Sequence, residues 1–268
     1  MITHKGEGRL TELVSYKKDN GIAVITIDNP PLNVMSRQVQ DEIQAIIRDI
    51  KHDNEVVCVV LYTAGTKAFI AGADIKEFPA MIGNPTMRTQ VMEIHEMLNE
   101  LDHLPKPTIA VLDGLTFGGG CELALTFDIR IAEEHATLGF PEVKLGLFPG
   151  GGGTQRLPRL VGEAKAKELM YTGEAISADT AEKIGLVNQV VPTGQGMEKA
   201  MVLADQIATK SLQALSRIKQ AVDEGLDLNL ADGIEREATL FSEVFQTEDV
   251  KEGVEAFIGK RKANFKHK

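Results

Sequence analysis

Three consecutive glycines, Gly118–Gly120, stand where a predicted buried strand gives way to a predicted helix. The strand is the apolar run 106–112, and the helix begins near Glu122. The first N–H groups of a helix have no partner within it, and the helix dipole places partial positive charge there. Because glycine has no side chain, a ligand can approach this backbone closely. The turn is therefore a candidate site for an oxygen that acquires negative charge, with Glu122 and the later Glu142 as proton-transfer groups.

Simpler interpretations of the same residues stay open at this point. Three glycines are also typical of a flexible loop or a tight packing contact, and acidic residues such as Glu122 are favoured in a first helical turn. Cys121 has no His nearby in the sequence to activate it, which favours a small packed thiol over a nucleophile. Neither the dinucleotide-binding pattern G-x-G-x-x-G nor the Lys-Ser/Thr of a P-loop accompanies the glycine runs.

The composition favours a cytoplasmic protein that binds neither nucleic acid nor membrane. The 268 residues carry a formal net charge of −10, whereas phosphate backbones are bound by concentrated positive charge. Two cysteines give no disulfide framework, and no apolar run is long enough to predict a transmembrane helix. Residues 1–8 lack the apolar core of a signal peptide. No His/Cys/Asp/Glu cluster has ligand spacing, so neither a metal nor a redox cofactor is expected.

The first part of the chain predicts a hairpin followed by a helix. Two runs, 13–16 and 22–27, are predicted strands, and they are separated by a segment that contains Asn20-Gly21, a strong hairpin-turn signal. Prolines after the second run end it. Ser36 is then expected to cap an amphipathic helix whose apolar side is buried.

The next part predicts a buried strand, a loop and more helices. The continuous apolar run 56–62 is expected to be a strand that is covered on both faces. A loop of small residues, 64–74, follows it, and Asp74 is a candidate cap for a helix that begins at Ile75. Helical periodicity over 91–101 predicts a further helix, in which the methionines are interpreted as adaptable packing.

The composition changes near residue 195 and predicts two parts. Residues 1–195 are expected to form an α/β body, whose last strand lies within 187–192. A second glycine run, 150–153, is interpreted as a structural loop that opens a helix containing Arg156 and that is close enough to Glu142 to shape a pocket. Residues 196–268 are expected to be helical and end in a basic tail.

Four segments together resemble the crotonase family, which contains enoyl-CoA hydratases and isomerases. They are FIAGADIKE at 69–77, GGGCELA at 118–124, FPEV at 140–143 and LFPGGGGTQRL at 147–157. Each segment is weakly specific alone, but their order and spacing are specific. The likeness runs from about Leu13 to the C-terminus and is greatest to the hydratases, because both acidic positions, in the second and third segments, are Glu.

The resemblance implies a spiral of repeated β-β-α units followed by a helical segment that mediates trimerisation, as a homotrimer or a dimer of trimers. It implies an oxyanion hole made by the backbone N–H groups of Ala73 and Gly119, which hold the carbonyl oxygen of an acyl-CoA thioester. The residues that it implies line the path of CoA are Ala73, Asp74, Ile75, Lys76 and Gly119, with Phe257 and Lys260 reaching CoA bound mainly by a neighbouring subunit.

The resemblance also implies the reaction. A trans-2-enoyl-CoA would gain water to give 3-hydroxyacyl-CoA, as in fatty-acid β-oxidation or related acyl-CoA metabolism. Glu122 would activate the water that attacks Cβ, and Glu142 would exchange the proton at Cα. Two backbone donors can stabilise the enolate charge without a metal or a cofactor other than the CoA of the substrate itself.

Two alternative functions remain open for this sequence. A Δ3,Δ2-enoyl-CoA isomerase needs the oxyanion hole and one proton carrier but no base that activates water, and the second glutamate disfavours it. A nucleic-acid-binding member of the same fold is supported only by the basic tail 260–268 and is disfavoured by the net charge of −10.

Overall fold

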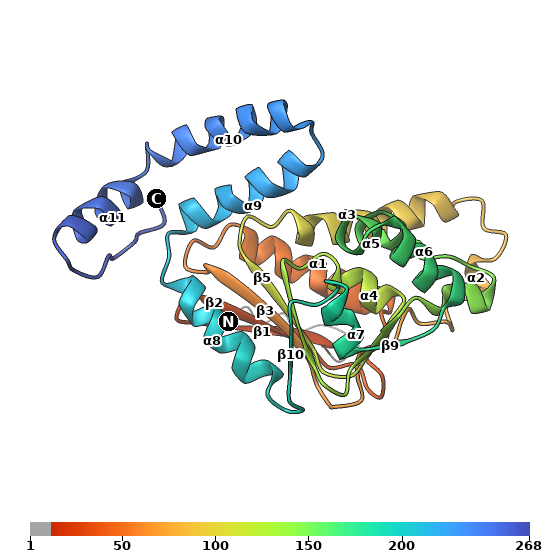
Figure 1. Ribbon diagram of the computed structural model, residues 1–268. Coiled ribbons are helices and arrows are strands. Elements are labelled where there is room, and N and C mark those ends of the chain that lie inside the picture. The colour runs from red at the N-terminus through yellow and green to blue at the C-terminus, as the bar shows by residue number, and fades with distance from the viewer. Residues whose placement is uncertain (1–11) are drawn as a thin grey trace, which may run out of the picture.

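The computed structural model describes residues 12–268, and the prediction made for residues 1–8 lies outside this range. The body contains two sheets with helices around them (Figure 1). The larger sheet has six strands in the order β1 (Val14–Asp19), β2 (Ile22–Ile27), β3 (Cys58–Thr63), β5 (Thr108–Leu112), β7 (Ile129–Glu133) and β10 (Gln189–Val191). The smaller sheet has four, in the order β4 (Ala68–Ile70), β6 (Leu115–Phe117), β8 (Thr137–Gly139) and β9 (Ile176–Ser177).

Successive strands alternate between the two sheets. The chain runs from β3 to β4, then through helices to β5 and β6, and then through a short helix to β7 and β8. From β2 to β10 the neighbouring strands of the larger sheet are parallel, as are β4, β6 and β8 in the smaller one. Parallel neighbours need a crossover connection, and helices provide it here. Each turn of the chain therefore adds one strand to each sheet, and this repeat is the predicted β-β-α unit.

The predicted hairpin and the first helix are confirmed. Strands β1 and β2 pair antiparallel, and the turn residues Asn20 and Gly21 have φ of +49° and +82°. Positive φ at both central residues is what a type I′ turn requires, and Asn-Gly meets it at low cost. Helix α1 (Arg37–Lys51) begins after Ser36, whose hydroxyl accepts a hydrogen bond from the Val39 N–H.

Both faces of the larger sheet are covered, as the apolar run 56–62 predicted. Helix α8 (Gly196–Ala208) packs on one face, where its Ala200 and Ala204 join Val60 and Ile109 in one apolar cluster. The opposite face packs against α1 and α3 (Met87–Asp102) in the larger core cluster. The strands are thus removed from water on both sides, which accounts for their uninterrupted apolar sequence.

Two local predictions are wrong. The helix expected from Ile75 begins three residues later, as α2 (Phe78–Met81), and Asp74 instead accepts a hydrogen bond from the Lys76 N–H within a turn. Pro79 explains the later start, because proline lacks an N–H and suits the first turn of a helix. The second error is the smaller sheet, none of whose strands was predicted. Strand β4 lies inside the expected loop 64–74, and β6 lies between the predicted strand and the glycine triplet, so the triplet follows the smaller sheet.

The remaining helices belong to two regions. Helices α4 (Gly119–Ala124), α5 (Gly153–Val161), α6 (Glu163–Thr172) and α7 (Ala178–Lys183) follow strands of the body. Helices α9 (Leu212–Leu226), α10 (Leu230–Val244) and α11 (Glu248–Ile258) form an arm that extends away from both sheets (Figure 1). No helix within residues 12–268 combines the length and the apolar character needed to cross a membrane.

The division at residue 195 stays a prediction, and the packing adds a detail to it. Because α8 covers the larger sheet, the part that separates in space from the body begins only with α9. An ion pair of the buried Lys219 fastens α9 to the body: Lys219 Nζ lies 3.0 Å from Oδ1 of Asp128, whose side chain is partly exposed. The carboxylate of Asp128 also accepts a hydrogen bond from the Thr108 N–H at the start of β5.

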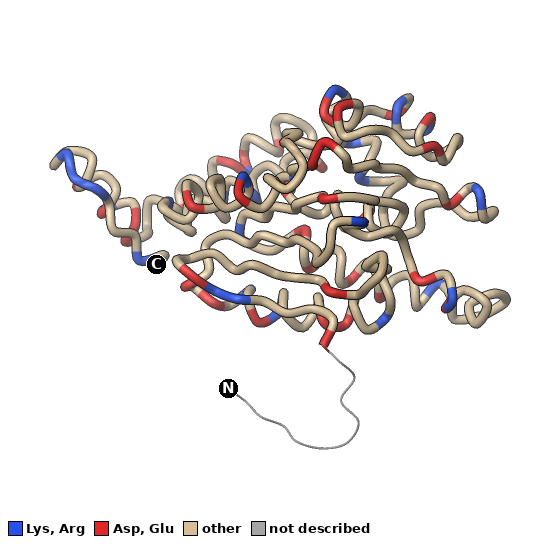
Figure 2. Tube along the Cα trace, turned by 90° about the horizontal axis from the view of Figure 1, so that it is seen from below, with Lys and Arg blue, Asp and Glu red and all other residues tan. Residues whose placement is uncertain are grey.

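The basic tail folds back on the arm. Figure 2 shows its Lys and Arg residues close to the C-terminus. The buried carboxylate of Asp249 accepts hydrogen bonds from the Ser211 hydroxyl at 2.6 Å and from the Lys266 N–H at 2.7 Å. Arg261 pairs with Glu252 at 2.6 Å. The tail thus ties the start of α9 to α11, and part of its positive charge is paired within the chain.

Candidate active site

Three strand ends bring the predicted site residues together. Strands β4, β6 and β8 are neighbours in the smaller sheet and parallel to one another, so the segments that follow them leave the same edge. Ala73 follows β4, Gly119 follows β6, and Glu142 follows β8. Residues far apart in the sequence therefore meet beside the glycine triplet. This edge is the candidate active site.

Close contacts on two sides of the glycine triplet leave no room for a side chain at Gly118 or Gly120. Gly118 has a φ of +50°, and a Cβ on it would lie 2.9 Å from Oε1 of Glu142. A Cβ on Gly120 would lie 2.2 Å from the carbonyl oxygen of Ile70 in β4. These distances confirm a tight packing contact, one of the two interpretations left open by the sequence. They also place the start of α4 directly against Glu142.

Two backbone N–H groups beside the triplet have no acceptor in the described part of the chain. Ala73 forms a parallel bridge with Met35, in which Met35 N–H donates to Gly72 O at 2.8 Å and Asp74 N–H donates to Met35 O at 3.2 Å. Neither the Ala73 N–H nor the Gly119 N–H donates to any residue between 12 and 268. A Cβ on Gly119 would lie 3.7 Å from the Ala73 nitrogen, so the two donors are adjacent.

Glu122 lies in α4 and is buried, with its carboxylate held by a second glycine run. Its Oε1 accepts hydrogen bonds from Gly151 N–H at 2.7 Å and from Gly153 N–H at 2.9 Å. Burial raises the pKa of Glu122, while these two hydrogen bonds and the charge of Arg156 act in the opposite direction. The carboxylate of Glu122 is therefore removed from water, but the two glycine N–H groups stabilise its ionised form.

Glu142 lies in the 3-10 helix Pro141–Leu145 and has one unsatisfied oxygen. Its Oε2 is buried, and no hydrogen-bond partner for it exists in the described part of the chain. Burial raises the pKa of Glu142 to about 7, and the negative charge of Glu122 adds to the rise. Two such carboxylates titrate as a pair. A carboxyl group that is free to exchange a proton near neutral pH suits general acid–base chemistry.

The second glycine run has a more direct role than the loop expected from the sequence. A Cβ on Gly151 would lie 2.6 Å from Oε2 of Glu122, and one on Gly153 would lie 3.1 Å from its Oε1. Glycine at both positions lets the backbone surround the carboxylate. This contact was not predicted from the sequence, although the unusual length of the glycine run 150–153 was a signal for it.

Comparison with known proteins agrees with this geometry. The family model described as "Enoyl-CoA hydratase/isomerase" matches residues 17–268. The chain belongs to the enoyl-CoA hydratase/isomerase family. A short-chain-enoyl-CoA hydratase of Clostridium acetobutylicum is 41% identical over 250 residues, which are 93% of this chain and 95% of that protein. A crotonyl-CoA hydratase of Syntrophomonas wolfei is 38% identical over 95% of this chain and 98% of that protein.

Solved structures of this family share the fold. The crystal structure of an enoyl-CoA hydratase from Bacillus anthracis superposes with a TM-score of 0.91 at 38% identity, and the match covers 96% of this chain and all of that one. A second structure, from Geobacillus kaustophilus, gives a TM-score of 0.92 at 35% identity, over 97% and 98% of the two chains. The predicted crotonase-like fold with C-terminal helices is thereby confirmed.

The family's predicted CoA contacts fall into two groups. Asp74, Ile75 and Lys76 directly follow the Ala73 donor, and the side chain of Ile75 is exposed. Phe257 and Lys260 lie at the end of α11, which Figure 1 places at the far end of the arm from α4. One chain therefore does not bring these two residues to the site, and their contact with CoA stays a prediction about a neighbouring subunit.

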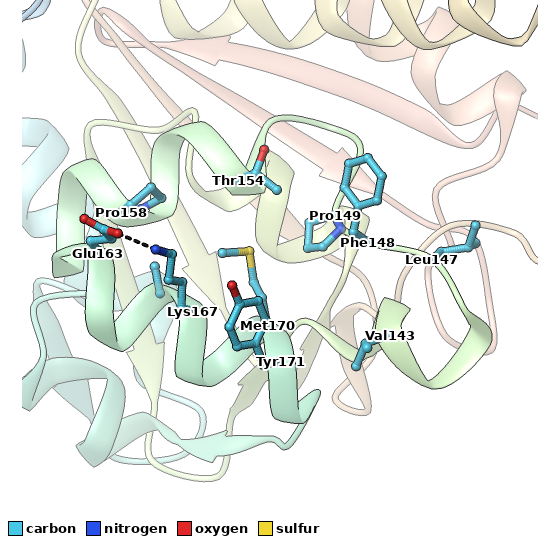
Figure 3. A pocket seen from close by; sticks show the side chains of 11 residues that line it. Val143, Leu147, Phe148, Pro149, Thr154, Pro158, Glu163, Lys167, Met170 and Tyr171 are labelled. Carbon is cyan, nitrogen blue, oxygen red and sulfur yellow. Dashed lines mark hydrogen bonds and ion pairs between the residues drawn. The ribbon is translucent and has the colours of Figure 1, made fainter.

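A separate apolar cavity of about 470 Å³ lies beside the site, between the 3-10 helix, α5 and α6 (Figure 3). Val143 and Thr154 line it and are next in sequence to Glu142 and Gly153, but Glu122 and Glu142 themselves do not line it. Phe148 and Tyr171 are largely exposed at its wall. The cavity is adjacent to the proton-transfer groups without containing them.

The remaining candidate residues have structural explanations. Cys121 is buried, its thiol donates to Thr116 O at 2.9 Å, and burial raises its pKa, which fits a packed thiol. Within residues 12–268 no three His, Cys, Asp or Glu side chains are placed to hold a metal ion together.

Proposed function

We propose that this protein is an enoyl-CoA hydratase, a hydro-lyase that adds water reversibly to trans-2-enoyl-CoA to give 3-hydroxyacyl-CoA. The observation that carries this proposal is the placement of two backbone donors, unpartnered within residues 12–268, beside the carboxylates of Glu122 and Glu142. Relatives that are 38–41% identical carry the names crotonyl-CoA hydratase and short-chain-enoyl-CoA hydratase, which supports the same substrate class here.

The steps follow from the positions of these groups. The thioester carbonyl oxygen accepts hydrogen bonds from the N–H groups of Ala73 and Gly119. Glu122 takes a proton from water while the water oxygen bonds to Cβ, and the electron pair of the double bond moves to the carbonyl oxygen. Glu142 then gives its proton to Cα as the enolate collapses to the thioester. Dehydration follows the same steps in reverse.

The electrostatics support this division of roles. Glu122 must be ionised to accept a proton, and two N–H donors stabilise its carboxylate despite burial. Glu142 must donate in one direction and accept in the other, and its pKa of about 7 keeps both forms populated at neutral pH. The N–H groups of Ala73 and Gly119 stabilise negative charge on the carbonyl oxygen, which develops only as the reaction proceeds. They therefore stabilise the transition state more than the bound substrate.

A panel of CoA esters tests the proposal. Trans-2-enoyl-CoA esters of graded chain length should lose the absorbance of the conjugated thioester as water adds. A 3-enoyl-CoA ester is the probe for isomerisation, which would instead create that absorbance. Activity on the 3-enoyl ester alone would favour the isomerase. Filter binding with a steep salt dependence, in the absence of either activity, would favour the nucleic-acid-binding alternative.

Dialysis against a strong chelator should leave hydratase activity unchanged. Two backbone donors replace a metal as the means of stabilising the enolate, so no metal or redox cofactor is needed beyond the CoA of the substrate. Activity is measured before and after dialysis, with a parallel sample dialysed without chelator. A large loss that added metal restores would contradict the mechanism.

A homotrimer, or a dimer of trimers, is the expected assembly. The arm exposes large apolar side chains that nothing in a single chain covers within residues 12–268. These include Leu226, Leu230, Phe241, Phe245, Phe257 and Ile258. Apolar surface of this extent marks an interaction site. Sedimentation analysis of the purified protein measures the mass, and a monomer at micromolar concentration would contradict the assembly.

Replacing Lys260 with Ala should raise the KM for CoA esters more than it lowers kcat. The proposed role of Lys260 is to hold a phosphate of CoA bound by a neighbouring subunit, as a flexible point charge that acts equally in the ground and transition states. Steady-state kinetics on one enoyl-CoA ester separates the two constants. A fall in kcat alone would place Lys260 elsewhere.

The cytoplasm is the expected location. Cys58 and Cys121 are both free and buried, which fits a reducing compartment. Burial raises the pKa of Cys58 to about 12, so its thiol stays protonated and unreactive. Fractionation of cells, with activity assayed in each fraction, checks this location, and recovery of most activity outside the cytoplasmic fraction would contradict it.

A further inference from the structure

The glycine run that holds Glu122 is itself held from behind by a charged side chain. Gly152 has a φ of +102°, and a Cβ on it would lie 2.3 Å from Nη1 of Arg156. The guanidinium therefore lies against Gly152. This residue stands between Gly151 and Gly153, whose N–H groups donate to Glu122. A small movement of this segment would displace both donors together.

Arg156 is fixed by two contacts with α3. Its Nε lies 2.7 Å from Oδ2 of Asp102, and its Nη2 donates to Oδ1 of Asn99 at 2.7 Å. The side chain of Arg156 is 17% exposed and that of Asp102 is 31% exposed, so this ion pair is partly shielded from solvent and is screened by salt less than a surface pair. A planar guanidinium can serve two acceptors and still present its third nitrogen to Gly152.

We propose that Arg156 is a positioning residue for Glu122, which fixes the segment Gly151–Gly153 and keeps positive charge behind the carboxylate that activates water. This inference rests on the proposed hydratase function, because it concerns how the base of that reaction is maintained. In this role Arg156 acts on Glu122 through the glycines and through its charge, and not on the substrate.

The charge of Arg156 opposes the effect of burial on Glu122. Burial raises the pKa of Glu122, and Arg156 lowers it. Other titratable groups act on this set from several elements: His95 of α3 lies beside Gly152, and Glu142 of the 3-10 helix interacts with Glu122. Arg130 of β7 and Asp223 of α9 interact with Asp102. Asp102 neutralises part of the charge of Arg156, so the field at Glu122 depends on both partners.

The pH dependence of kcat/KM tests the proposal. Glu122 must be ionised, so its titration forms the acidic limb of the profile. Arg156→Gln removes the cation and should move that limb to higher pH by about one unit, with kcat reduced most at low pH and KM changed little. Arg156→Lys keeps the charge but loses the planar contacts. The acidic limb should therefore stay at the same pH, while kcat falls by the same factor at every pH.

Two further variants complete the experiment. Arg159→Gln makes the same change three residues later on α5, at an exposed arginine whose ion pair with Asp227 is 3.7 Å long, and should leave the profile unchanged. Asp102→Asn keeps the cation and removes the carboxylate that neutralises it, so the acidic limb should move to lower pH. This opposite shift can be measured even if Arg156→Gln does not fold.

The outcomes separate the two proposals. Equal losses at every pH in Arg156→Gln and Arg156→Lys, with the limb unmoved, would reduce Arg156 to a structural role and overturn the inference. A shift to higher pH in Asp102→Asn, or none, would also contradict it. An unaltered enzyme that hydrates no 2-enoyl-CoA ester would instead overturn the proposed function.

Discussion

Glu142→Gln should abolish exchange of the α-proton of a saturated acyl-CoA with deuterated solvent, whereas Glu122→Gln should retain much of it. Exchange requires the two backbone donors and a base at Cα, but no attacking water. Glu142 is the proposed base at Cα, and Glu122 is the proposed base for water. Gln keeps the size of each side chain and can still accept the glycine N–H bonds at position 122.

Hydration should fall by about 10²–10⁴ in each of these two variants, because both proton transfers belong to one overall reaction. Hydration alone therefore does not assign the roles, and the two effects need not add. Proton NMR measures the exchange, and thermal unfolding with CoA binding confirms that each variant is folded. Equal loss of exchange would mean that the roles are shared, and the reverse pattern would mean that they are exchanged.

Gly119→Pro should lower kcat for hydration by about 10²–10³ while the fold is retained. Gly119 is the first residue of α4, a position where proline is tolerated because its missing N–H has no helical partner. The substitution therefore removes one of the two proposed oxyanion donors with little cost to the helix. Steady-state hydration kinetics gives the loss in kcat, and thermal unfolding reports stability.

Glu163→Pro is the matched control for this variant. Glu163 is also the first residue of a helix, α6, and it also follows a glycine with positive φ, since Gly162 has a φ of +83° and Gly118 a φ of +50°. Its side chain is exposed and lies outside the proposed site. If Gly119→Pro hydrates as fast as the control, the Gly119 N–H is not an oxyanion donor.

Several parts of the fold could be predicted because their causes are local. Asn20-Gly21 adopts the two positive φ angles of a tight hairpin turn, and Ser36 supplies the oxygen that caps α1. The two wrong predictions also have local causes. Pro79 moved the start of a helix. The strands of the smaller sheet have only two or three residues each, too few for a pattern of burial to be read from the sequence.

The sequence predicted the residues of the candidate site, but it did not predict the residues that hold Glu122 in place. The glycine triplet and the two glutamates carry a recognisable pattern, because ligand approach and proton transfer restrict the residue types allowed. The cradle of Gly151 and Gly153 around Glu122 was missed, and so was the contact of Arg156 with Gly152. The cradle joins Glu122 to glycines 29 and 31 residues away in sequence. Arg156 is turned towards Gly152 by Asp102 and Asn99, which lie 54 and 57 residues before it.

The sequence by itself determined which groups are available: two glutamates, two glycine-rich turns and enough apolar strands to bury them. Only the tertiary structure decided how those groups behave. Parallel pairing of β4, β6 and β8 places the N–H groups of Ala73 and Gly119 side by side. Burial then raises the pKa of Glu142 to about 7, because removing a carboxylate from water disfavours its charged form, and no neighbour in the sequence produces that effect.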